Sequence, residues 1–127
     1  MKTPLPESSR IKRDDPTLGA LRYGRAYTLA IEALQTMCCA SGSMRERLQQ
    51  IDLEFYTLKP DDLPENEGVR KSFIQFHQLA TRVAPRWAGE GKVAATLNQS
   101  RHTKLRQMAQ LVWDINRDFS RYMNSDA

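Results

Sequence analysis

A chain of 127 residues, 40% of them hydrophobic and 27% charged, is long enough for one folded domain and too short for two ordinary ones. This composition argues against wholesale disorder. No apolar run approaches the roughly 20 residues that span a bilayer, and the polar start of the chain lacks the apolar middle of a secretory signal. We therefore expect a soluble, cytoplasmic protein that does not contact membranes.

The net charge of +4 is unevenly distributed along the chain. Residues 43–67 contain three basic and seven acidic side chains, a net charge of −4, so the remainder of the chain carries +8. Such a polarity favours an oriented encounter with a charged partner.

The cysteines and histidines of the chain do not predict a metal or cofactor site. Cys38 and Cys39 are the only cysteines, and their adjacency on a predicted helix indicates two reduced thiols. The two histidines, His77 and His102, are far apart in the sequence, and no metal-ligand spacing links them to the cysteines. The sequence predicts neither a metal nor a cofactor.

The first 40 residues divide into an arm and a helix. Residues 1–16 are rich in proline and serine and include Arg10, Lys12 and Arg13, which predicts a flexible basic arm. Residues 17–40 are expected to form a helix that ends at Ser41 and Gly42. Its apolar stripe has spacings of four and three residues: Ala20, Gly24, Tyr27, Ile31, Leu34 and Cys38.

Two further helices are predicted on either side of a proline-rich turn. The sequence from Ser43 to Glu46 has the form of a capping box, which predicts a helix over 43–58. Pro60 ends this helix, and Leu63 in the turn is placed to plug one end of a helical core. The next helix is expected over 64–83, before Pro85.

The last helix has the most regular apolar pattern of the chain. A loop over 84–91 and one or two helical turns over 93–97 precede it, and its expected range is 99–123. Its stripe consists of Leu105, Met108, Val112, Ile115, Phe119 and Tyr122. Four amphipathic helices without strand-like alternation predict an all-α, single-domain antiparallel four-helix bundle over 17–124, preceded by the flexible basic arm.

Three motifs in the middle of the chain carry a resemblance. They are Gly42-Ser43-Met44-Arg45-Glu46-Arg47-Leu48, Lys59-Pro60-Asp61-Asp62-Leu63-Pro64, and Gly89-Glu90-Gly91-Lys92-Val93-Ala94-Ala95-Thr96-Leu97. In this order they resemble a group of short, uncharacterised bacterial helical proteins, over roughly residues 42–116. The resemblance implies a bacterial or mobile-element origin and a compact helical domain. It supplies no activity that could be carried over.

One pair of residues suggests catalysis. Arg70 and His77 have the Arg-x6-His spacing of some helical ribonucleases, which places them on one helix face about two turns apart. No phosphate-binding loop, serine elbow or metal-binding helix motif accompanies them. We interpret the chain as a non-enzymatic protein and keep an Arg-His ribonuclease as the third hypothesis.

Binding is the function that the sequence favours. Candidate contacts to a protein partner or to phosphates are Arg10, Lys12, Arg13, Trp87, Arg101, Lys104 and Arg106. Arginine and tryptophan are frequent interface anchors, so we expect a bacterial or phage-type regulator, adaptor, inhibitor or immunity factor that binds another protein or a second copy of itself. Nucleic-acid binding through the basic arm and the last helix is the alternative.

Overall fold

The computed structural model of the chain describes residues 16–65 and 67–124, and within these ranges it is all-α. The helices are α2 (Pro16–Cys39), α3 (Met44–Gln50), α4 (Leu53–Tyr56), α5 (Glu67–Ala80), α6 (Lys92–Gln99) and α7 (His102–Met123), and a 3₁₀ turn, η1, covers Pro60–Asp62. No helix in these ranges has the length and hydropathy of a membrane span. The predicted arm, with Arg10, Lys12 and Arg13, lies outside the described residues except for Pro16.

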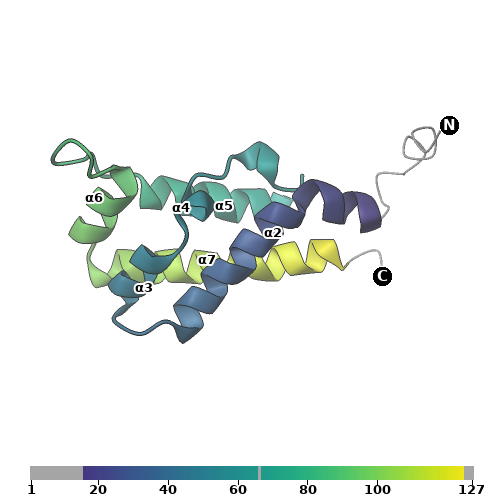
Figure 1. Ribbon diagram of the computed structural model, residues 1–127, viewed down its shortest axis with the longest axis horizontal. Coiled ribbons are helices and arrows are strands. Elements are labelled where there is room, and N and C mark those ends of the chain that lie inside the picture. The colour runs from purple at the N-terminus through teal and green to yellow at the C-terminus, as the bar shows by residue number, and fades with distance from the viewer. Residues whose placement is uncertain (1–15, 66, 125–127) are drawn as a thin grey trace.

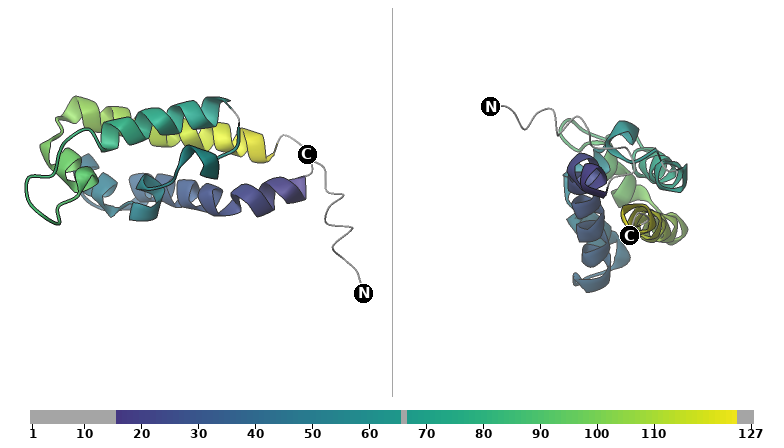
Figure 2. Two further views of the ribbon diagram at one scale, coloured as in Figure 1. Left: turned by 90° about the horizontal axis from the view of Figure 1, so that it is seen from above. Right: turned by 90° about the vertical axis from the view of Figure 1, so that its right-hand side faces the viewer.

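Three long helices form the frame of the molecule. α5 and α7 lie side by side and run in opposite directions, and α2 also packs against α7 (Figures 1 and 2). The short helices α3 and α6 lie at the end of the molecule where α5 ends and α7 begins (Figure 1). The start of α2 and the end of α7 lie at the opposite end.

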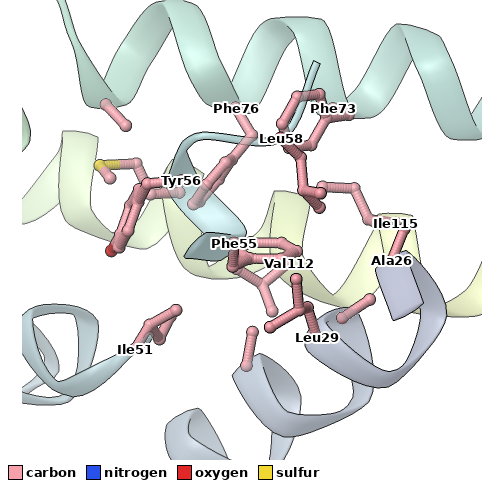
Figure 3. Close-up of a cluster of buried hydrophobic side chains, with 14 of the residues drawn as sticks. Ala26, Leu29, Ile51, Phe55, Tyr56, Leu58, Phe73, Phe76, Val112 and Ile115 are labelled. Carbon is pink, nitrogen blue, oxygen red and sulfur yellow. The ribbon is translucent and has the colours of Figure 1, made fainter. Parts of the chain in front are cut away.

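The core is centred on aromatic rings from α4 and α5. The ring of Phe55 lies 5.3 Å from that of Phe76 and 6.1 Å from that of Phe73, centroid to centroid, within the range of favourable aromatic pairs. Aliphatic side chains of α2 and α7 close the cluster from the other side (Figure 3). Leu63 is also buried in this core, as predicted for the turn before α5. The four residues of α4 thus join the frame through two buried rings.

Only part of the predicted apolar stripe of the first helix reaches the core, where Tyr27 and Leu34 pack at its edge. Ile31 is 36% exposed and Cys38 is exposed, whereas the buried side chains of α2 are Tyr23, Ala26, Leu29, Ala30 and Ala33. The reason is size: α7 presents bulky side chains to α2, and the alanines leave room for them. The bulky stripe of α2 therefore lies at the margin of its packing surface.

The predicted helix over 43–58 is interrupted. Ile51 has an extended backbone with ψ of 137°, and the side chain of Asp52 accepts a hydrogen bond from the backbone N–H of Glu54 at 2.9 Å. This local bond offers the backbone an alternative to the helix, and it starts α4 in a new direction. The apolar residues of the segment still reach the core, since Leu48, Ile51, Phe55 and Leu58 are buried.

The other predicted helix boundaries shift by a few residues. α5 begins at Glu67 rather than 64 and ends at Ala80 rather than 83, and α7 begins at His102 rather than 99. The short helical stretch expected over 93–97 is the full helix α6. Ser100 follows α6 as its C-cap, and its hydroxyl donates to the carbonyl of Thr96.

Candidate binding pocket

A pocket of about 680 Å³ opens between α4, the end of α5 and the start of α6. We call it the α4–α6 pocket; its lining includes Leu53, Tyr56, His77, Lys92, Val93 and Leu97. Tyr56 and Leu97 are buried, whereas Leu53 is 62% exposed. The volume lies within the range of small-molecule and anchor-residue pockets.

The break between α3 and α4 creates the floor of this pocket. Because Asp52 restarts the helix, Tyr56 turns inward, where its hydroxyl donates to the carbonyl of Leu48 at 2.6 Å and its ring stacks on Phe76 at 5.4 Å. Burial raises the pKa of Tyr56 far above its usual range. The phenol is therefore neutral at physiological pH, and its one proton is held by a backbone carbonyl.

One wall of the pocket is the loop between α5 and α6. Its Glu90 side chain is only 1% exposed and accepts hydrogen bonds from the backbone N–H of Arg86 at 2.7 Å and from its guanidinium at 2.8 Å. These bonds from Arg86 lower the pKa of Glu90. Gly89 and Gly91, with φ of 91° and 79°, supply the left-handed turns on either side of this acid. The wall is thus fixed around an ionised carboxylate.

The same loop displays a tryptophan. Trp87 is 56% exposed, and the guanidinium carbon of Arg86 lies 4.7 Å from the centroid of its ring. This cation–π contact and the bonds of Arg86 to Glu90 hold the indole next to the pocket wall. Trp87, a contact residue predicted from the sequence, is therefore presented to solvent on an anchored loop.

The motifs behind the family resemblance perform structural tasks around this pocket. The guanidinium of Arg45 donates to the carbonyls of Leu97 and Ser100, at 3.0 and 2.6 Å, which ties α3 to the end of α6. Asn98 accepts a hydrogen bond from Gln49 of α3 at 3.1 Å. These contacts hold α3 and α6 in one arrangement, so the first and third motifs help to position the pocket.

Arg70 and His77 do not converge on one site. Arg70 donates from Nη2 to the carbonyl of Leu63 at 3.0 Å and from Nε to that of Pro64 at 3.1 Å, at the start of α5. His77 lines the α4–α6 pocket about 10 Å further along the helix axis, and its ring packs on Phe73. Among the described residues, moreover, no group of three or more His, Cys, Asp or Glu side chains could hold a metal.

The basic candidates of the last helix lie apart from the pocket. Arg101, Lys104 and Arg106 are exposed in the first turns around the start of α7 and do not line the α4–α6 pocket. None of them forms an ion pair with a described carboxylate. They are exposed basic side chains at the start of α7, outside the pocket.

Comparisons of the chain with protein-family models, curated proteins and solved structures give no match. The pocket is therefore characterised by its own geometry. Of the candidates from the sequence, His77 lines the pocket and Trp87 lies on the adjoining loop. Leu53 and Tyr56 were not among the candidates, because their positions depend on the break in the helix. The available signal was Asp52, a strong helix-start residue in the middle of a predicted helix.

Proposed function

We propose that this chain is a small, non-enzymatic bacterial or phage-type binding protein that works in the cytoplasm through protein–protein contacts, as a regulator, adaptor, inhibitor or immunity factor. The observation that carries the proposal is Leu53, an aliphatic side chain that is 62% exposed at an apolar pocket. Exposed apolar surface at a concave site is typical of docking sites. Trp87, half exposed on the adjoining loop, adds an aromatic anchor.

The partner that suits this pocket is a protein segment with an apolar anchor side chain. The buried rings and aliphatic groups of the floor offer an apolar environment, and Lys92 is exposed at the edge. An aliphatic or aromatic side chain of the partner would fit the apolar floor, and an acidic residue beside it would pair with Lys92. Burial of Leu53 by such a segment would supply about 2 kcal/mol of binding energy.

We also propose that the architecture is a variant of the antiparallel four-helix bundle in which α3 and α4 together replace the second helix. The spacing of one helix stripe continues across the break through Met44, Leu48, Ile51, Phe55 and Leu58. All of them except Met44 are buried. This pattern supports one interrupted helix rather than two independent elements.

The test of the pocket is affinity capture from cells that express the chain, with quantitative comparison of the bound proteins. We expect Leu53→Glu to lose the specific partner, because it would bury a charge in an apolar contact. The matched control is Ile74→Glu, since Ile74 is 39% exposed on α5 and does not line the pocket. A partner held equally by both variants would contradict the assignment of the pocket, and the absence of any specific partner would contradict protein binding.

Nucleic-acid binding is the second candidate, and it is favoured by the exposed basic side chains at the start of α7. Arg101, Lys104 and Arg106 are exposed without a described carboxylate partner, so their charges remain available for phosphates. A gel-shift titration at two salt concentrations tests it. A shift that persists at moderate salt and weakens in Arg101→Ala/Lys104→Ala supports this function, and the absence of any shift contradicts it.

A further inference from the structure

The ionisable side chains that remain free in the lining of the α4–α6 pocket are basic. Glu90 is the only carboxylate in this lining, and hydrogen bonds from Arg86 and Asn98 occupy both of its oxygens. Lys92 and His77 line the same pocket and form no ion pair with a described carboxylate. At neutral pH an ammonium group donates hydrogen bonds, and an imidazole carries at least one N–H donor. The pocket therefore offers donors and positive charge to a ligand.

The first turn of α6 adds backbone donors to the same wall. Gly91, the N-cap of α6, has no side chain to accept a hydrogen bond, and the first turn contains no acid. The first backbone bond of the helix joins the N–H of Ala95 to the carbonyl of Gly91 at 3.1 Å. The N–H groups of Lys92, Val93 and Ala94 precede it and have no acceptor among the described residues. All three residues line the pocket, so free donors lie beside its apolar floor.

We propose that the α4–α6 pocket binds a small amphipathic carboxylate, a molecule with a hydrocarbon or aromatic body and a carboxylate at one end. The body contacts Ile51, Tyr56 and Leu97, which are buried and line the pocket. The carboxylate accepts hydrogen bonds from the first turn of α6 and pairs with Lys92. The pocket volume of about 680 Å³ lies within the range of small-molecule sites. This ligand needs no protein partner.

The lining selects this class of ligand over its neighbours in chemistry. An amine in place of the carboxylate would bring its positive charge beside Lys92 and the backbone donors, which is repulsive. A neutral alcohol would gain no ion pair. A bare anion such as phosphate would leave the apolar floor in contact with water, and would forgo the burial that contributes most of the binding energy of an amphipathic molecule.

Calorimetric titration of the full-length chain tests the ligand class with octanoate, octanol and octylamine, which share one hydrocarbon chain. We expect octanoate to bind at a saturable site and the other probes to bind at least about tenfold more weakly. Octanol or octylamine binding as tightly as octanoate would overturn the recognition of the carboxylate. The absence of saturable octanoate binding at low-millimolar concentrations would overturn the whole proposal.

Lys92 provides the test of where the carboxylate binds. Lys92→Met keeps most of the aliphatic stem and removes the charge, so the dissociation constant of octanoate should rise about fivefold while that of octanol stays unchanged. Lys92→Glu should reverse the preference, so that octylamine binds more tightly than octanoate. The matched control is Lys71→Met, because Lys71 is exposed on α5 and does not line the pocket. Equal effects of Lys71→Met and Lys92→Met, or no reversal in Lys92→Glu, would refute this site.

These titrations contain no protein partner, so they are independent of the affinity capture that tests protein binding. Circular dichroism checks that the helices of each variant remain intact. Octanoate binding without capture of a specific partner would support the carboxylate site and contradict protein binding. Capture of a partner without octanoate binding would support protein binding and overturn the carboxylate site.

Discussion

Glu90 shows how a single buried residue links the sequence to the shape of the pocket. Its carboxylate is held by Arg86 through the backbone and the guanidinium, and by Asn98 through a longer bond of 3.4 Å. Because these donors favour the ionised form, the pKa of Glu90 in the folded chain lies below its ordinary value of 4.5. Protonation would remove the main acceptor of the loop.

This shift makes the stability of the fold depend on pH in the acid range. The lowered pKa of Glu90 stabilises the folded state fully above about pH 4.5, and this contribution is lost as the pH falls toward the folded pKa. We expect Glu90→Gln to be less stable than the wild type at neutral pH, with a difference that shrinks on acidification. Urea unfolding at a series of pH values measures this. A difference in stability that is independent of pH would contradict the assigned role of Glu90. Hydrogen bonds from Ser43 lower the pKa of Glu46 in both proteins, so the stability of each still falls somewhat in acid.

At the scale of the element, the short helix α4 depends on its N-cap. The side chain of Asp52 caps α4 by accepting from the backbone N–H of Glu54, whose own carboxylate accepts a hydrogen bond from Arg25 of α2. We expect Asp52→Ala to lower the free energy of unfolding by about 1 kcal/mol, because a backbone donor loses its partner. Denaturant unfolding provides the measurement. Asp61→Ala is the matched control, since Asp61 is exposed in η1, and a change within about 0.5 kcal/mol is expected. Equal losses in the two variants would exclude a specific capping role.

How well each helix could be predicted from the sequence depends on which residue types it buries in the core. The stripe of α7 could be identified from the sequence because its buried members are large and regularly spaced. On α2 the same reasoning selected bulky residues, whereas the core contains Ala26, Ala30 and Ala33. How well these alanines pack depends on the side chains of the helix opposite them. The α4–α6 pocket depends on one local hydrogen bond of Asp52, which competes with helix propensity. Neither the facing helix nor this competition is visible in the spacing of apolar residues.

At the scale of the whole molecule, the short helices and the long ones should unfold together. Helices of four to eight residues are not stable alone in water, so α3, α4 and α6 depend on their contacts with the frame. Arg45 ties α3 to α6, and the rings of α4 enter the core that α5 and α7 share. We therefore expect the short and long helices to unfold as a single cooperative unit, because the loss of one segment exposes apolar surface of the next.

Leu48 provides the test of this cooperativity, since it lies on α3 and is completely buried. We expect Leu48→Ala to lower the free energy of unfolding by about 2–5 kcal/mol, because the cavity left in the core is only partly refilled. In a Trp113→Phe background, the fluorescence of Trp87 reports on the pocket loop, and far-UV circular dichroism reports on all helices. Both signals should shift to lower urea by the same amount in Leu48→Ala and retain one midpoint. An earlier midpoint for Trp87 would mean that the pocket end unfolds separately, and the pocket would then be a locally ordered part of a more stable frame formed by α2, α5 and α7.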